Sequence, residues 1–378
     1  MNRTAAKAAV VGIGATSFGV FPGQTSYSLG ASALQAALSD AAMKKEEIDA
    51  LIVVRIPDYQ RFAQMYGFSP SMGISLQPQG RMSGVAMHLA NALISSGTAR
   101  NVALVYGNDG KSSGARYGGV TDRYSGEGAT TWLPYGMTSP GATHAMMFAM
   151  HAHRYGTTST ALAHVAVAFR EHATLNPAAV MRKPLSIEEH QASKFIAEPL
   201  HLFDYCQIND GGVAMILTQS ERVGDHPHKP AYIRATGCET ELANSLFPMQ
   251  EFWYPSMRKL SKRIYADAGL DPADMQALMI YDNFTPTVLF SLEGFGYCKQ
   301  GESGPWVSDG HIARGGRYPT NTSGGHLSES YMQGWALLAE SVRQVRGEAL
   351  ERQIVDAHNV HYMCAASISS SVIFSDTP

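Results

Sequence analysis

The sequence is poor in charged residues, and it lacks long apolar runs. Only 16% of its 378 residues are charged and the formal net charge is −3, so there is no basic excess to neutralise the phosphates of a nucleic acid. No run of about 18 apolar residues occurs, which excludes an ordinary transmembrane helix. With 45% hydrophobic residues the chain can still bury a large core, which excludes a disordered protein. We expect a soluble, cytoplasmic protein.

Cysteine is also scarce. Four cysteines occur, at Cys206, Cys238, Cys298 and Cys364. This number is too small for a disulfide scaffold, and the spacing fits no zinc site. The 14 histidines are not paired with carboxylates at the spacing of a metal site, so no metal is expected.

Apolar runs typical of strands alternate with segments that have the apolar spacing of helices. Strands are expected at residues 8–13, 48–54, 101–106, 213–218, 231–236, 277–281, 355–363 and 368–374. Helices are expected at residues 27–43, 82–96, 143–155, 160–174, 257–268, 285–294 and 329–345. Residues 57–80 are expected to be irregular, and residues 107–142 to form a long loop excursion. This alternation predicts an α/β fold with parallel strands and crossover helices.

Two parts of the sequence resemble each other. Residues 40–51 align without gaps to residues 267–278, and residues 101–107 are similar to residues 359–365. Because the two matches occur in the same order, they indicate a duplicated α/β unit. We expect halves at about 1–230 and 231–378.

The early glycines do not form a nucleotide loop. Gly12-Ile-Gly14 is followed by Gly19, which is misplaced for a dinucleotide-binding motif. No acidic residue follows in a strand about 20 positions on. A nicotinamide site is therefore not expected.

Two segments stand out as candidates for chemistry. Tyr281-Asp-Asn-Phe-Thr-Pro286 ends a predicted strand and enters a helix. Asn321-Thr-Ser-Gly-Gly325-His-Leu-Ser-Glu-Ser-Tyr331 is a Gly-Gly turn that enters the next helix. The carboxyl ends of strands hold the sites of open α/β folds. The residues alone are equally consistent with two ordinary turns in which both tyrosines are packing residues.

Essentially the whole chain resembles the thiolase superfamily, in its sterol-carrier-protein-x branch. The resemblance rests on residues 95–107, 203–212 and 321–325. It implies a thiolase fold, in which two βαβαβαββ halves form a layered α/β arrangement.

The chain departs from the thiolase pattern at three positions. Thiolases have a nucleophilic cysteine where this sequence has Met82, in Gly80-Arg-Met82-Ser-Gly84. The branch has a histidine at the position of Tyr281, and thiolases have another at the position of Tyr331. This pattern resembles the thiolase-like aldolases that shorten steroid side chains, which are also similar around residues 196–200, 280–286 and 292–302.

The resemblance implies a carbon–carbon lyase that performs retro-aldol cleavage of a β-hydroxyacyl-CoA to a ketone or aldehyde and a shorter acyl-CoA. Tyr281 and Tyr331 would be the catalytic pair, since a phenol can both donate and accept a proton. The substrate would be carried as a CoA thioester, with no tightly bound cofactor. The resemblance also implies a small partner with an OB fold and often a zinc ribbon, and a homodimer or a heterotetramer with that partner.

Five further residues are candidates for the substrate pocket or for holding the enolate oxygen. They are Gly325, His326, Asn283, Met82 and Cys364. Backbone N–H groups after Gly80 or Gly325 are the expected donors to the oxygen. Cys364 lies near the second cysteine of thiolases, although a packed core thiol is the simpler interpretation.

Two other functions remain open from the sequence. One is a non-catalytic, thiolase-like subunit that binds acyl-CoA. The other is a residual thiolase or acyltransferase that uses Cys364 or Cys298. The residues do not indicate which β-hydroxyacyl-CoA is cleaved, or which tyrosine is the base.

Overall fold

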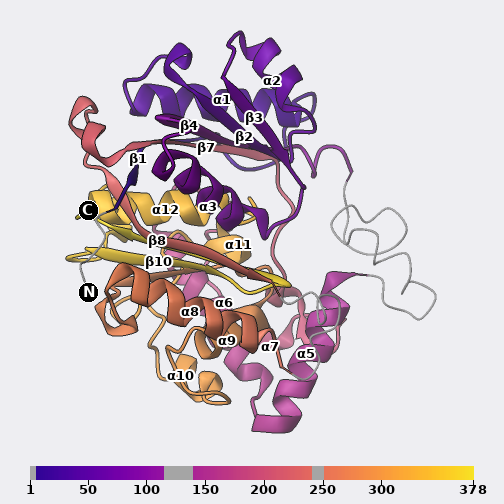
Figure 1. Ribbon diagram of the computed structural model, residues 1–378. Coiled ribbons are helices and arrows are strands. Elements are labelled where there is room, and N and C mark those ends of the chain that lie inside the picture. Colours follow the sequence, from indigo (N-terminus) through magenta and orange to yellow (C-terminus); the bar gives the residue numbers. More distant parts are fainter. Residues whose placement is uncertain (1–5, 115–138, 241–250) are drawn as a thin grey trace.

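Two layers of β-sheet with helices between them organise the chain (Figure 1). The computed structural model describes residues 6–114, 139–240 and 251–378. Elements up to residue 219 are β1 (Ala8–Ala15), α1 (Ser26–Asp40), β2 (Ala50–Val54), α2 (Tyr59–Tyr66), β3 (Met72–Leu76), α3 (Met82–Ser95), β4 (Asn101–Asn108), α5 (Pro140–Tyr155), α6 (Ser159–Thr174), α7 (Ile187–Ala192), β5 (Phe195–Ala197), β6 (Leu200–His201) and β7 (Gly211–Gln219). The later elements are β8 (Ala231–Thr240), α8 (Tyr254–Ala268), β9 (Ala277–Ile280), α9 (Thr285–Gly294), α10 (Ser303–Ser308), α11 (Gly325–Ser328), α12 (Trp335–Arg346), β10 (Asn359–Cys364) and β11 (Ile368–Ser375).

The strands follow the order β3-β2-β4-β7-β1-β8-β11-β10-β9. β2 is parallel to β3 and β4, and β9 is parallel to β10. β1 and β8 are joined by two residue pairs, Ala9 with Tyr232 and Val10 with Ala231. The strands on the two sides of this short join form the two sheet layers of Figure 1.

The two layers repeat one strand order. In chain order, the first layer contains β1, β2, β4 and β7, and the second contains β8, β9, β10 and β11. Across the sheet these strands are arranged as β2-β4-β7-β1 and β9-β10-β11-β8, so both layers have the order second, third, fourth, first. The first layer carries β3 as an additional edge strand. The expected α/β class is confirmed. The expected parallel pairing is only partly correct, because β7 is antiparallel to β1 and β4, and β11 is antiparallel to β8 and β10. The division into halves at residue 230 stays a prediction.

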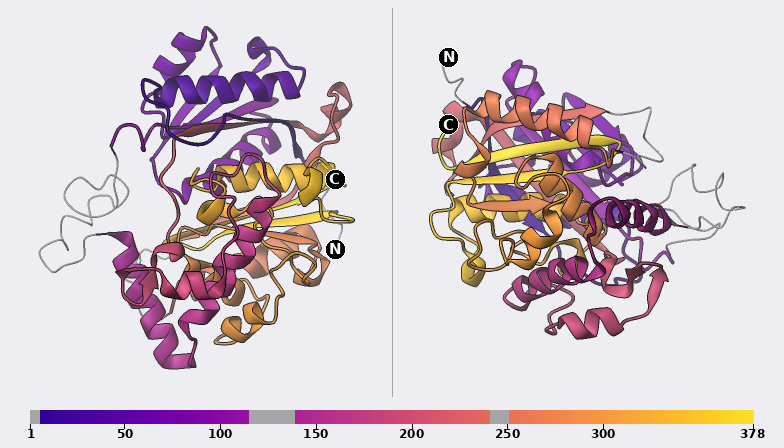
Figure 2. Two further views of the ribbon diagram at one scale, coloured as in Figure 1. Left: turned by 180° about the vertical axis from the view of Figure 1, so that it is seen from behind. Right: turned by 90° about the horizontal axis from the view of Figure 1, so that it is seen from below.

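Helices cover the outer faces of both sheets and fill the space between them. α1 and α2 lie on the outer face of the first sheet, α3 and α12 lie between the sheets, and α8 and α9 lie on the outer face of the second (Figure 1). α5, α6 and α7 extend to one side of the second layer (Figure 2). The apolar core between the sheets includes Met82, Tyr281, Tyr331 and Cys364. Within the described ranges, no helix is long and apolar enough to cross a membrane.

Close packing of α1 on β1 explains the early glycines. A methyl group added at Gly12 would lie 2.3 Å from the carbonyl oxygen of Ala37, and one at Gly14 would lie 2.2 Å from that of Ala33. Glycine is required here because the helix backbone passes directly over the strand.

The prediction that residues 57–80 are irregular was wrong, because α2 and β3 lie within them. Asp58 caps α2 by accepting hydrogen bonds from the N–H groups of Gln60 and Arg61. Gly67 ends the helix in a left-handed conformation, with φ of 77°. Both residues are standard helix boundary signals for a short helix.

The predicted helix at residues 329–345 begins six residues later than expected, at Trp335. Gln333 and Gly334 have φ values of 49° and 89°, which a right-handed helix does not allow. Tyr331 therefore lies in a turn between α11 and α12. The predicted strand at residues 355–363 begins only at Asn359.

The predicted excursion begins after β4, which ends at Asn108, and α5 starts at Pro140 instead of residue 143. Proline is favourable at the first position of a helix. Residues 115–138 of this excursion lie outside the described residues.

Candidate active site

The candidate site lies at the carboxyl ends of the adjacent parallel strands β9 and β10. Tyr281 directly follows β9, and its N–H donates to the carbonyl oxygen of Met363 at 2.9 Å. Cys364 is the last residue of β10. The strand ladder thus brings Tyr281 and Cys364 to the same sheet edge.

Two tyrosines meet at this edge. The hydroxyl oxygens of Tyr281 and Tyr331 are 2.9 Å apart, and either can be the donor. Their exposed fractions are 5% and 6%, so both rings are buried. Burial raises the pKa of Tyr281 well above 10.0, and the nearby Tyr331 raises it further. The structure thus joins the two residues that the resemblance assigns to catalysis, while their catalytic role stays a prediction.

The backbone of Tyr331 is held by a part of the chain far away in sequence. Its N–H donates to Oδ1 of Asn209 at 3.0 Å. The carbonyl oxygen of Asn209 in turn accepts from Nδ2 of Asn108 at 2.7 Å. Asn209 was not a candidate residue, although it lies in the segment 203–212 on which the resemblance rests.

The turn before α3 lies directly over Tyr281. A methyl group added at Gly80 would be 1.6 Å from the Tyr281 hydroxyl oxygen. Met82 is the first residue of α3 and belongs to the same apolar core as both tyrosines. Its N–H donates to the carbonyl oxygen of Gln79 at 3.0 Å, so this group is already hydrogen-bonded.

Arg81 introduces a positive charge near Tyr281 and Cys364. Its Nη1 donates to Oγ of Ser367 at 2.8 Å, while its Nε is buried without a hydrogen-bond partner. Burial lowers the pKa of Arg81, and the proximity of Cys364 and Tyr281 opposes that shift. The sequence analysis missed this residue. The sequence does contain a feature that could have indicated Arg81, because an arginine at the start of a helix is unfavourable for the helix dipole and is therefore unusual.

His326 packs against both tyrosines. Its ring centre lies 4.7 Å from that of Tyr281 and 5.1 Å from that of Tyr331. Nε2 accepts from the N–H of Gly334 at 2.8 Å, which places the ring proton on Nδ1. Burial lowers the pKa of His326 to about 3, so the ring is neutral. His326 thus forms one wall of the tyrosine site.

Asp282 fixes the turn that carries His326. Its carboxylate accepts from the N–H groups of His326 at 2.9 Å and Leu327 at 3.2 Å. A methyl group at Gly325 would lie 2.3 Å from Asp282 Oδ2, so glycine is needed for this approach. The first two N–H groups after Gly325 are therefore directed to Asp282 and not to the tyrosine pair.

The side chain of Asn283 is occupied at the start of α9. Its Oδ1 accepts from Thr287 Oγ1 at 2.8 Å, and its Nδ2 lies 3.4 Å from Nε2 of His144. The structure therefore directs this side chain to α9 and α5 and not to the tyrosine hydroxyls.

Three cysteines are held in their thiol form by burial. Burial raises the pKa of Cys364 to about 12 and that of Cys238 to about 11. Burial also raises the pKa of Cys298. A thiol reacts as a nucleophile in its thiolate form, so Cys364 and Cys298 are poorly suited to thiolase chemistry. Across the described ranges, no three His, Cys, Asp or Glu side chains are grouped so that they would hold a metal ion.

Comparisons with known proteins identify the family. The family model "Thiolase C-terminal domain-like" matches residues 239–374. A steroid side-chain-cleaving aldolase from Thermomonospora curvata is 35% identical over 96% of this chain and 96% of the relative. The chain belongs to the thiolase superfamily. A 17-hydroxy-3-oxo-4-pregnene-20-carboxyl-CoA lyase from Mycobacterium tuberculosis is 36% identical over 91% of this chain and 92% of that protein.

Solved structures agree with this placement in the thiolase superfamily. The Ltp2-ChsH2(DUF35) aldolase covers 98% of this chain and 97% of its own, with 33% identity and a TM-score of 0.89. Human mitochondrial 3-ketoacyl-CoA thiolase covers 99% of both chains, with a TM-score of 0.73 and 14% identity, and shows the shared fold. The predicted thiolase fold and the predicted resemblance to CoA-dependent aldolases are confirmed.

Proposed function

We propose that the protein is a carbon–carbon lyase that cleaves a β-hydroxyacyl-CoA by a retro-aldol reaction. The observation that carries the proposal is the 2.9 Å contact between the hydroxyl oxygens of Tyr281 and Tyr331. The turn over Tyr281 leads into α3, whose first residue is Met82, where thiolases have a nucleophilic cysteine. A thioether has no ionisable proton, so Met82 cannot form the thiolate that thiolysis requires. Cleavage by proton transfer alone needs no covalent intermediate.

The tyrosine pair can move one proton from oxygen to carbon. Because burial raises the pKa of Tyr281, this residue keeps its proton and serves as the acid. Tyr331, as a phenolate, takes the proton of the substrate β-hydroxyl. The Cα–Cβ bond then breaks, its electron pair passes to the thioester as an enolate, and Tyr281 protonates Cα. Tyr331 finally returns its proton to Tyr281 across the 2.9 Å contact, so the pair ends as it began.

Arg81 would stabilise the negative charge that this route needs. Arg81 lies near Tyr281, so its charge favours the tyrosine pair with one proton removed, and a preorganised cation lowers the energy of a developing enolate. Arg81→Gln should therefore lower kcat and move the rise of kcat with pH to higher pH, while Arg81→Lys should retain part of the activity. A pH–rate profile of the three proteins measures this. Identical profiles for Arg81→Gln and the wild type would contradict the role.

The names of the relatives suggest the substrate and the partner. One relative is named for a pregnene-carboxyl-CoA, and a similar structure is named the Ltp2-ChsH2(DUF35) aldolase. By analogy, this chain would act on a steroid side chain carried as a CoA thioester, together with a small OB-fold partner that often bears a zinc ribbon.

The deciding experiment compares two substrate types with and without free CoA. A β-hydroxyacyl-CoA with a tertiary β-carbon should be cleaved without CoA, and the products followed by mass spectrometry should be a ketone and a shorter acyl-CoA. A β-ketoacyl-CoA should stay intact even with excess CoA. CoA-dependent cleavage of the ketone would return the protein to thiolase chemistry. No cleavage of either substrate in the presence of the partner would indicate a non-catalytic subunit.

A further inference from the structure

A cavity lies near the start of β9, away from the tyrosine pair at the end of this strand. It has a volume of about 460 Å³ and is lined by Gln276, which directly precedes β9, whereas Tyr281 directly follows it. None of the residues that line this cavity is among those described around the tyrosine pair. Its volume is within the range of about 300–1,000 Å³ typical of small-molecule sites.

The cavity carries positive charge that no described carboxylate neutralises. Arg317 donates to the carbonyl oxygens of Met275 at 3.3 Å and Ala273 at 2.6 Å. Arg314 donates to the carbonyl oxygen of Glu351 at 3.4 Å. Carbonyl oxygens satisfy N–H groups but leave the net charge unchanged. Neither arginine forms an ion pair within the described residues.

Arg352, which also lines the cavity, is different. Its Nη2 lies 3.0 Å from Oε2 of the buried Glu340. This ion pair neutralises its charge, so the positive potential of the cavity comes from Arg314 and Arg317.

A buried histidine, His172, also lines the cavity. Burial lowers its pKa to about 4, although backbone groups of Thr320 and Asn321 oppose this shift. The ring is therefore neutral and does not add to the charge of Arg314 and Arg317.

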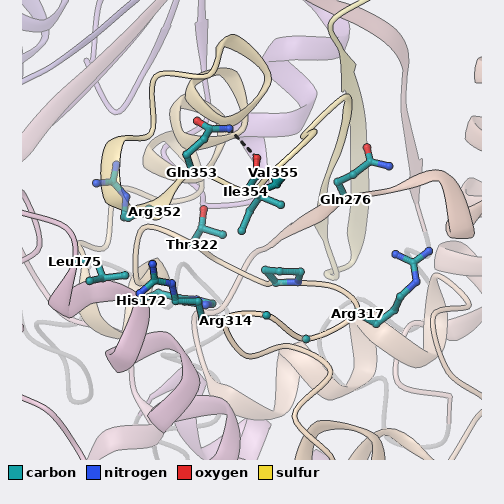
Figure 3. Close-up of a pocket in the computed structure, with 13 residues that line it drawn as sticks. His172, Leu175, Gln276, Arg314, Arg317, Thr322, Arg352, Gln353, Ile354 and Val355 are labelled. Carbon is teal, nitrogen blue, oxygen red and sulfur yellow. Dashed lines mark hydrogen bonds between the residues drawn. The ribbon is translucent and has the colours of Figure 1, made fainter.

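The remaining wall is apolar. Pro319, Leu175, Ile354 and Val355 line it, and Val355 is 82% exposed, which places it at the rim. Figure 3 shows Arg314 next to His172 on one side and Arg317 near Gln276 on the other. The cavity thus offers separate polar and apolar contacts to one ligand.

We propose that this cavity binds a small organic anion. Its carboxylate or phosphate group is held by Arg314 beside His172, and its carbon skeleton lies against Pro319 and Ile354. Arg317 adds positive potential from the other side. Guanidinium groups bind carboxylate and phosphate oxygens with similar geometry, so both acid groups fit.

Calorimetric titration with four small probes tests the proposal on the full chain. Benzoate and phenyl phosphate combine an acid group with a ring, inorganic phosphate lacks the ring, and benzyl alcohol lacks the charge. We expect one equivalent of benzoate or phenyl phosphate to bind, at least 10-fold more tightly than benzyl alcohol or inorganic phosphate. Whichever of benzoate and phenyl phosphate binds more tightly identifies the acid group that the cavity prefers. Equal binding of benzyl alcohol, or no binding of either acid up to about 10 mM, would overturn the proposal.

Variants locate the binding. Arg314→Gln should weaken binding at least 10-fold, Arg317→Gln should weaken it less, and Arg314→Lys should retain part of it. Arg100→Gln changes an exposed arginine at the start of β4 and is the matched control. Tyr331→Phe should leave binding unchanged, because the tyrosine site lies at the other end of β9. Unchanged binding by Arg314→Gln with an unchanged Tm would contradict the proposed site.

Discussion

At the scale of single residues, the two tyrosine hydroxyls depend on each other. A phenol is a weak acid in water, and burial raises the pKa of Tyr281 well above 10.0. A buried phenol is useful as an acid if a partner can return its proton. The hydroxyl of Tyr331 at 2.9 Å is such a partner. In the proposed mechanism the chemistry therefore belongs to the pair and not to either residue alone.

Removing either hydroxyl should abolish most of the activity. Tyr331→Phe and Tyr281→Phe each keep the ring and delete one hydroxyl, so the proton relay is broken while the core packing remains. We expect kcat to fall about 10²–10⁴-fold and the free energy of unfolding to change by only about 1 kcal/mol. Turnover assays and thermal denaturation measure the two effects. Near wild-type rates for both variants would exclude the tyrosine mechanism.

Glu329 makes stability depend on pH. Burial raises its pKa from an ordinary 4.5 to about 7, and the nearby Glu340 adds to this shift, which Ser323 and Asn176 oppose by hydrogen bonds. The folded state therefore holds a proton that the unfolded state releases above pH 4.5. The free energy of unfolding should fall as the pH rises from 4.5 through 7, by on the order of 3 kcal/mol from this group.

Glu329→Gln should remove this part of the pH dependence, since the amide has no proton to lose. Denaturant unfolding at pH 5 and pH 8 measures the difference for both proteins. The same loss of stability in Glu329→Gln and in the wild type would assign the effect to other groups.

At the scale of elements, the turn that begins α3 sets the space above Tyr281. Gly80→Ala would place a methyl group 1.6 Å from the Tyr281 hydroxyl oxygen, so the turn or the ring must move. We expect activity to fall at least 10-fold. Gly224→Ala is the matched control, because no atom lies within 4 Å of the added methyl group there. Equal activity of the two variants in a turnover assay would show that the contact with Gly80 does not matter.

Local patterns predicted most elements and one part of the site. The apolar run before Tyr281 is a strand, as the sequence indicates. The Gly-Gly segment before Tyr331 begins the short helix α11, which the sequence analysis did not predict. The start of α12 was missed because the positive φ of Gln333 is unusual for a non-glycine residue and has no clear sequence signal. α2 is different, since Asp58 and Gly67 mark its ends and could have been used.

Contacts between distant segments could not be predicted from local patterns. Arg81 is 286 residues from Ser367, its hydrogen-bond partner, and Asn209 is 122 residues from Tyr331. The sequence indicates which side chains are able to donate or accept, but only the fold determines which of them meet. The position of Arg81 near Tyr281 therefore required the structure.

At the scale of the whole molecule, β3 is an edge strand of the described sheet. An unpaired strand edge offers N–H and C=O groups to another chain. We expect two copies to form a symmetric dimer, which also binds the OB-fold partner. Light scattering after size-exclusion chromatography should give twice the mass of one chain, and a larger mass when the partner is added. A fully active monomer without a partner would contradict this expectation.

The position of β1 in the sheet has a consequence for synthesis. β1 lies between β7 and β8, which comprise Gly211–Gln219 and Ala231–Thr240. β1 leaves the ribosome long before β7 and β8, and it therefore stays unpaired until both of these strands have been translated. Contacts between such distant segments form slowly, and an unpaired apolar strand favours aggregation. Folding in the cell should thus depend on protecting the nascent chain until β8 has been made.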